Sequence, residues 1–105
     1  MKPPSRGDVY WANLDPVIGR EIKKTRPVVV VSPNEMNRFL GTVIAAPLTS
    51  TRRNWPTRVP VRTARKVSHA AIDQIRVLSV ERLGRRIGAV DPAPLLAVLR
   101  EMFAD

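Results

Sequence analysis

A run of four valines, Val28–Val31, follows directly after Pro27 and a cluster of basic residues. β-branched side chains favour strands, and an apolar run without polar alternation is typical of a strand whose two faces are both covered. Short β-branched runs recur along the chain between ten prolines, which favour frequent turns. These features predict a mostly β protein built from short strands.

The predicted strands are numerous and close together in the sequence. We expect them at residues 9–14, 27–32, 42–48, 58–61, 67–73, 75–79 and 87–90; alternatively, the fifth and sixth form one long bent strand. Pro27 should be the first residue of its strand, and Pro47 should mark an edge or a bulge, because proline has no N–H to donate to a ladder. Single helical turns are expected at residues 33–38 and 79–86.

The C-terminal segment has the pattern of an amphipathic helix. Asp91 is a favourable N-cap, Pro92 suits the first helical position, and the apolar residues from Leu95 to Phe103 follow helical spacing. A chain of 105 residues is long enough for one domain with one core. We therefore expect residues 1–105 to form a single domain, in which five to seven strands close on themselves beside one terminal helix.

Basic residues are in large excess. The chain has 18 Lys and Arg against 9 Asp and Glu, a net charge of +9, and no acidic residue lies between Glu35 and Asp73. Such a tract attracts polyanions, so nucleic acid or an acidic protein segment is the expected partner, with a merely solubilising surface as the alternative. The absence of cysteine excludes disulfides and thiolate chemistry. We expect no metal, cofactor or membrane segment, and a cytoplasmic location.

Two strand ends carry candidate catalytic side chains. Arg26 precedes the valine strand, which would hold its Cα firmly while the planar guanidinium reaches a phosphate or a developing phosphorane. The alternative is an ion pair with Glu21 or Asp8. Thr49 and Ser50 follow the next strand, where a hydroxyl could bind a phosphate oxygen or orient a nucleophile, or could simply form a turn.

Two further features suggest contacts with RNA. Trp55 lies among arginines in the predicted loop 49–57, and aromatic side chains beside arginine stack unpaired bases; alternatively, Trp55 covers the end of the barrel core. His69 would share one strand face with Ala71 and Asp73. It is therefore a candidate auxiliary base that titrates near neutral pH, or else a packing residue.

Three segments, in this order and spacing along the chain, resemble the MazF/PemK family of toxins. They are RGDVYWANLDPVIGREIKKTRPVVVVSPNEMN (6–37), APLTS (46–50) and DQIRVLSVERLGRRIG (73–88). The resemblance extends from Arg6 to the final helix and implies a small SH3-like barrel of the MazF/CcdB type that acts as a homodimer. It also implies sequence-specific, metal-independent cleavage of single-stranded RNA, with messenger RNA as the main expected substrate and transfer or ribosomal RNA as alternatives. The implied protein partner is an antitoxin whose flexible acidic tail occupies the RNA groove.

The resemblance assigns roles to individual residues. Arg26 and Thr49 match the catalytic pair of the MazF branch, and Glu21 matches a supporting acidic residue. The Kid branch instead uses a histidine in the first loop and an arginine two residues before the aspartate that corresponds to Asp73. This chain has Arg20 and Ala71 there, so a Kid-type mechanism is not expected. The expected RNA-binding residues are Arg20, Lys23, Lys24, Thr25, Ser50, Arg52, Arg53, Trp55, Asp73 and Gln74.

RNA supplies its own nucleophile, the 2′-OH, so the implied chemistry requires only alignment, charge stabilisation and proton transfer. Arg26 would stabilise the phosphorane, Thr49 would hold a phosphate oxygen or the 2′-OH, and Glu21 would act as base or orient Arg26. The products would be a 2′,3′-cyclic phosphate and a 5′-OH end. Two alternatives remain: a non-catalytic CcdB-like toxin that poisons a topoisomerase, and a barrel that binds RNA without cutting it.

Overall fold

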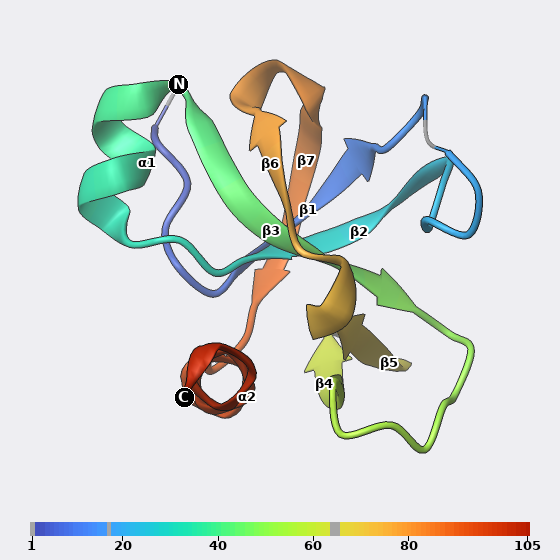
Figure 1. The fold of residues 1–105 in the computed structure, drawn as a ribbon. Coiled ribbons are helices and arrows are strands. Elements are labelled where there is room, and N and C mark those ends of the chain that lie inside the picture. Colours follow the sequence, from blue (N-terminus) through green and yellow to red (C-terminus); the bar gives the residue numbers. More distant parts are fainter. Residues whose placement is uncertain (1, 17, 64–65) are drawn as a thin grey trace.

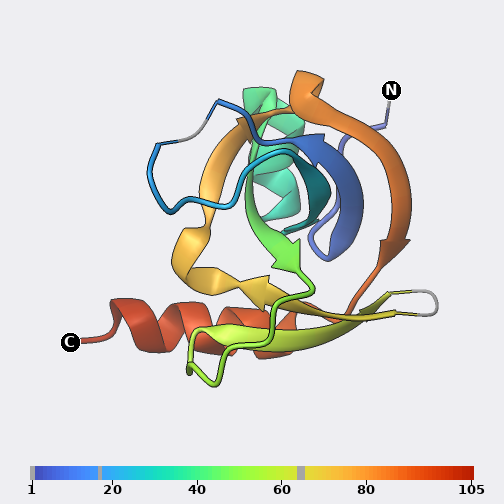
Figure 2. The same ribbon diagram turned by 90° about the vertical axis from the view of Figure 1, so that its right-hand side faces the viewer.

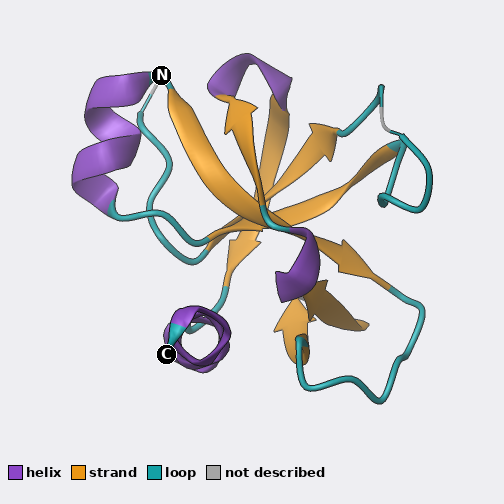
Figure 3. Ribbon diagram, in the orientation of Figure 1, coloured by secondary structure: helices purple, strands orange, loops and turns teal. Residues whose placement is uncertain are grey.

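The computed structural model describes residues 2–16, 18–63 and 66–105, and strands dominate the fold (Figure 3). The strands are β1 (Asp8–Asn13), β2 (Thr25–Val30), β3 (Thr42–Thr49), β4 (Arg58–Thr63), β5 (Lys66–Ala71), β6 (Arg76–Ser79) and β7 (Leu83–Ala89). The α-helices are α1 (Asn34–Leu40) and α2 (Ala93–Phe103), and two 3₁₀ helices, η1 (Ile72–Gln74) and η2 (Val80–Arg82), flank β6. The prediction of a mostly β fold with one C-terminal helix is confirmed.

The strands form one antiparallel sheet that curls into a half-barrel (Figure 1). Its order is β4-β5-β3-β2-β1-β7, and β6 pairs with β3. Helix α2 lies beside the β4–β5 hairpin (Figure 2) and places Leu95 in the same apolar cluster as Val59 and Val61. The helix therefore covers one face of the curled sheet.

The valine run supplies both hydrophobic cores. Val29 and Val31 belong to the cluster that contains Leu95, while Val28 and Val30 belong to a second cluster on the opposite face of the sheet. Successive side chains of a strand point to opposite faces, so an unbroken apolar run fills both sides at once. The expectation that both faces of this strand are covered is confirmed.

Two of the prolines within strands, Pro27 and Pro47, do not lie where the sequence predicts. Pro27 is the third residue of β2, opposite Trp11 of β1, but β2 pairs with β3 only from Val28 onward. Pro47 is buried inside β3 opposite Val28, not at an edge. On the other side of β3, the β6 ladder covers residues 42–45 and the β5 ladder covers residues 48–49, so Pro47 falls in the gap between them. A missing N–H is tolerated there because no ladder passes through it.

Three boundaries also differ from the expectations. Residues 67–79 form neither one bent strand nor two abutting strands, because η1 separates β5 from β6 and takes Asp73 out of the sheet. Helix α1 continues to Leu40, which is longer than one turn. Strand β7 begins at Leu83, four residues before the predicted start.

The C-terminal helix begins one residue later than predicted. Pro92 precedes α2, and the Asp91 side chain accepts a hydrogen bond from the N–H of Ala93 at 3.0 Å. Asp91 therefore satisfies one of the free N–H groups of the first turn, as a capping residue does. Among the described residues, no helix is both long and apolar enough to cross a membrane.

Candidate active site

A cleft of about 770 Å³ opens between two loops at one end of the half-barrel. One is the β1–β2 loop, described at residues 14–16 and 18–24, and the other is the β3–β4 loop, residues 50–57. The cleft is lined by Arg20, Glu21, Ile22, Lys23, Arg26, Thr49, Thr51, Arg53, Trp55, Arg58, Asp73 and Gln74. Five of these are basic and two are acidic, so the cleft favours a polyanion.

Arg26 and Thr49 reach this cleft from neighbouring strand ends. The β2–β3 ladder pairs Val28 with Pro47, and the same register extended by two residues places Arg26 opposite Thr49. The Nε of Arg26 donates to the carbonyl of Lys23 at 2.9 Å, which fixes the direction of the guanidinium. Within the described residues, Arg26 makes no ion pair with an acidic side chain.

The Thr49 side chain is well ordered by its surroundings. Thr49 is only 7% exposed, and its Oγ1 accepts a hydrogen bond from the N–H of Thr51 at 3.1 Å. That bond uses a lone pair of the oxygen, so the hydroxyl proton remains available to a ligand in the cleft. Thr49 can therefore donate to a phosphate oxygen beside Arg26.

The β1–β2 loop brings further charges to the cleft. The carboxylate of Glu21 accepts a hydrogen bond from the N–H of Ile18 at 2.8 Å, which closes a turn of the loop. Lys24 has a φ of 71° and donates its N–H to the carboxylate of Asp15 at 3.0 Å. Of the residues expected to bind RNA here, Arg20 and Lys23 line the cleft, whereas Lys24 and Thr25 do not.

The β3–β4 loop presents an aromatic ring. Trp55 is 50% exposed and belongs to neither core cluster, which favours a surface for stacking over the alternative in which it covers the end of the core. The guanidinium carbons of Arg58 and Arg53 lie 4.7 Å and 5.8 Å from the ring centroid, both within cation–π range. Arg53 and Trp55 line the cleft, but the expected RNA ligands Ser50 and Arg52 do not.

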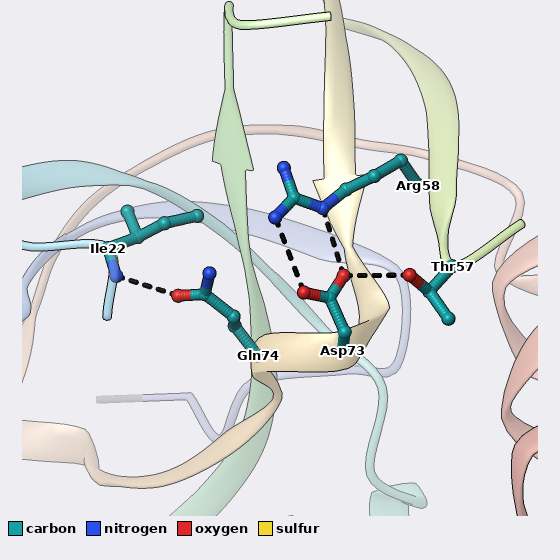
Figure 4. Close-up of polar contacts among 5 residues, drawn as sticks. All are labelled: Ile22, Thr57, Arg58, Asp73 and Gln74. Atoms are coloured by element: carbon teal, nitrogen blue, oxygen red, sulfur yellow. Dashed lines mark hydrogen bonds and ion pairs between the residues drawn. The ribbon is translucent and has the colours of Figure 1, made fainter. Parts of the chain in front are cut away.

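Asp73 and Gln74 line the cleft from η1, and each has a defined partner (Figure 4). Asp73 accepts from Nε and Nη2 of Arg58 at 2.9 Å and 3.3 Å, and from the hydroxyl of Thr57 at 3.0 Å. Gln74 accepts from the N–H of Ile22 at 2.7 Å through its Oε1. The amide orientation of Gln74 is therefore fixed, because only its oxygen can accept from that N–H.

Sequence reasoning grouped Arg58 with the arginines around Trp55 but did not include it among the expected site residues. Arg58 and Asp73 are fifteen positions apart, and only the β4–β5 register, which pairs Arg58 with Ala71, brings the guanidinium to η1. A basic residue two positions after the Trp55-Pro56 pair is the signal that could have identified Arg58.

Asp73 titrates below its ordinary range. Burial alone would raise its pKa, but hydrogen bonds from Arg58 and Thr57, together with the charge of Arg58, outweigh burial and lower the pKa below 3.8. A carboxylate whose pKa is lower in the folded state than in the unfolded chain stabilises the fold at pH values above its unfolded-state pKa. That stabilisation is lost as the pH falls through the pKa of the group in the folded state.

The free energy of unfolding should therefore contain an acid-dependent contribution from Asp73. We expect the difference between wild type and Asp73→Asn to be largest above about pH 5 and to shrink toward pH 3. Urea denaturation across this range measures it. Asp91→Asn is the matched control, because Asp91 caps α2 and has no ion pair among the described residues. A difference for Asp73→Asn that stays constant from pH 6 to pH 3 would contradict the ion-pair account.

His69 lies beside the site but does not line the cleft. It pairs with Thr49 in the β3–β5 ladder, and its Nδ1 is buried without a hydrogen-bond partner among the described residues. His69 and Ala71 are both in β5, whereas Asp73 is not, so the expected three-residue face is only partly correct. Across residues 2–16, 18–63 and 66–105, no three His, Cys, Asp or Glu side chains are grouped to hold a metal ion.

The half-barrel and its cleft define a small, basic, mostly β protein whose cleft carries an excess of positive charge. The family model of PemK-like, MazF-like toxins of type II toxin–antitoxin systems matches residues 5–102, and the chain belongs to this family.

Individual relatives agree with this assignment. Endoribonuclease EndoA of Bacillus subtilis (strain 168) is 37% identical over 92 residues, which cover 82% of this chain and 79% of that protein. A mycobacterial endoribonuclease solved in complex with its cognate antitoxin matches with a TM-score of 0.78 and 31% identity, over 93% of this chain and 92% of that one. MazF of Deinococcus radiodurans has a TM-score of 0.88 over 100% of both chains; at 24% identity it supports the fold alone.

Proposed function

We propose that this protein is the toxin of a toxin–antitoxin pair and acts as a sequence-specific, metal-independent endoribonuclease on single-stranded RNA. The observation that carries the proposal is the arrangement of Arg26 and Thr49, which line one cationic cleft from adjacent strand ends. The names of the relatives at 31–37% identity support the same activity. Messenger RNA is the proposed substrate, with transfer and ribosomal RNA as alternatives.

The cleft can stabilise a pentacoordinate phosphorane. As the 2′-OH attacks the adjacent phosphorus and the bond to the 5′-oxygen breaks, negative charge increases on the non-bridging oxygens. The Arg26 guanidinium and the Thr49 hydroxyl would donate to those oxygens, and donors that are held in place before the reaction stabilise developing charge most effectively. The products are a 2′,3′-cyclic phosphate on one fragment and a 5′-OH on the other.

Glu21 is the carboxylate best placed to take the proton from the 2′-OH. The cleft is lined by two carboxylates, and that of Asp73 is committed to Arg58 and Thr57. Glu21 is held through one hydrogen bond from Ile18, which leaves acceptor capacity on its carboxylate. An arginine guanidinium keeps its proton in proteins, so Arg26 is assigned to charge stabilisation and not to proton abstraction. His69 remains a candidate auxiliary base behind Thr49.

The remaining cleft residues would bind the RNA chain. Arg20, Lys23 and Arg53 supply positive charge for phosphates, and half-exposed Trp55 offers a surface on which an unpaired base can stack. The same charges would accept the acidic tail of an antitoxin, which would then compete with RNA for the cleft. We further propose that the protein acts as a homodimer in the cytoplasm, where its substrate is found.

The proposal predicts cleavage of single-stranded RNA in the presence of EDTA. A mixed-sequence transcript should be cut at a small set of recurring sites, and end mapping should find 2′,3′-cyclic phosphate and 5′-OH termini. A duplex of the same sequence is the control and should remain intact. RNA that is bound but not cut would instead identify a non-cleaving RNA-binding barrel. If the protein neither binds nor cuts RNA, the CcdB-like alternative of a protein target becomes the working hypothesis.

A further inference from the structure

Arg58 contacts one wall of the cleft directly and is linked to the other through η1, although no catalytic role is proposed for it. It is the first residue of β4, and its side chain is only 7% exposed despite its charge. A buried guanidinium is costly unless its donors are paired. Here Nε and Nη2 form two bonds to one carboxylate, the geometry in which arginine binds most specifically.

The first contact of Arg58 is with the β3–β4 loop. Its guanidinium carbon lies 4.7 Å from the centre of the Trp55 ring. The backbone N–H of Arg58 also donates to the backbone carbonyl of Trp55 at 3.1 Å. The ring thus rests on a side chain that is itself held by Asp73. Arg58 is the nearer of the two guanidinium groups beside the ring, since that of Arg53 lies 5.8 Å from the ring centre.

The second contact reaches the β1–β2 loop through η1. Asp73 is held by Arg58, and the next residue, Gln74, accepts the hydrogen bond from the N–H of Ile22 (Figure 4). Ile22 is the immediate neighbour of Glu21, the proposed base. A chain of short polar contacts therefore runs from Arg58 to the loop on the opposite wall.

We propose that Arg58 is a positioning residue that sets the spacing of the two walls of the cleft, Trp55 directly and Glu21 through Asp73, Gln74 and Ile22. This inference rests on the proposed function only in taking the cleft as the RNA site. Removing the guanidinium should release both walls at once. The two cores contain no part of this chain of contacts except the Ile22 side chain, so the sheet should remain folded.

The test uses Arg58→Met, which keeps the aliphatic stem and removes the donors. Arg62→Met, at an exposed arginine of the same strand, is the matched control. Amide exchange followed by NMR should show the Ile22 N–H exchanging about tenfold faster in Arg58→Met, with the amides of β2 unchanged. In a Trp11→Phe background, which leaves Trp55 as the single tryptophan, acrylamide quenching should increase. On a mapped substrate, kcat should fall by about tenfold or more, because misplacing reacting groups slows the chemical step.

A conservative variant distinguishes positioning from general stability. Arg58→Lys keeps one positive charge beside Asp73 but loses the two-point contact, so we expect Ile22 exchange and kcat to lie between those of wild type and Arg58→Met. If Arg58→Met does not fold, Arg58→Lys serves in its place.

Two outcomes would overturn the inference. One is an Arg58→Met protein with unchanged Ile22 exchange and unchanged Trp55 quenching. The other is loss of protection at Ile22 and throughout β2 together, which would make Arg58 a stability residue only. Failure of the wild type to cleave RNA would refute the proposed function instead, and the exchange and quenching measurements would still decide the role of Arg58.

Discussion

Replacing Arg26 with alanine is expected to lower the rate of RNA cleavage by about 10²- to 10³-fold, the usual cost of removing one donor that stabilises developing charge. The side chain makes one polar contact among the described residues, to the carbonyl of Lys23, and it belongs to neither core. The melting temperature should therefore change little. Single-turnover cleavage of a mapped RNA measures the effect, and thermal denaturation confirms that the variant is folded.

Arg26→Lys separates charge from geometry. Lysine keeps a positive charge but presents no planar fork, so its activity should lie between those of wild type and Arg26→Ala. Arg100→Ala is the control for lowered net charge, because Arg100 is exposed on α2 and does not line the cleft. It should cleave at the wild-type rate. A folded Arg26→Ala protein with near-normal activity would refute the assignment of Arg26 to the reaction.

The largest expected effect on stability comes from Gly7→Ala. Gly7 has a φ of 94°, and a Cβ added there would lie 2.6 Å from the carbonyl oxygen of Val90. Its N–H donates to the carbonyl of Val30 and its own carbonyl accepts from the N–H of Val90, each at 2.8 Å, so the backbone cannot move aside without losing both bonds. We expect the free energy of unfolding to fall by roughly 2–4 kcal/mol.

Urea denaturation of Gly7→Ala measures this loss, and Gly88→Ala is its control. A Cβ at Gly88 would meet no atom within 4 Å, and φ there is not positive, so the change should be neutral or slightly stabilising. Equal stabilities for the two variants would show that the junction between the N-terminal segment, β2 and β7 relaxes around the added methyl group.

The fold could be predicted from the sequence wherever one local pattern dominates. The valine run indicates a strand with two covered faces, and the spacing from Leu95 onward indicates a helix; both are confirmed. The errors occur where long-range pairing decides. Pro47 is tolerated inside β3 because two different strands pair on either side of it, and nothing near Pro47 in the sequence reveals that gap. Asp73 leaves the sheet because η1 turns the chain from β5 to β6.

The same contrast between local patterns and long-range pairing holds for the candidate site. Arg26 and Thr49 stand at the ends of two strands that the sequence itself makes evident, so their meeting in one cleft could be anticipated. The partnership of Arg58 with Asp73 could not, because it depends on the register of the β4–β5 hairpin. Among the basic residues expected to bind RNA, Lys24 and Arg52 do not line the cleft, whereas their sequence neighbours Lys23 and Arg53 do, and composition does not encode that difference.

The two loops that border the cleft differ in how freely they can diverge between related proteins. The β1–β2 loop contributes Leu14 and Ile22 to a core cluster, so insertions or exchanges within it would disturb the interior. The β3–β4 loop contributes no side chain to either cluster. Evolution, or an engineer, can therefore lengthen or replace residues 50–54 at little thermodynamic cost, and a new recognition sequence is most accessible through that segment.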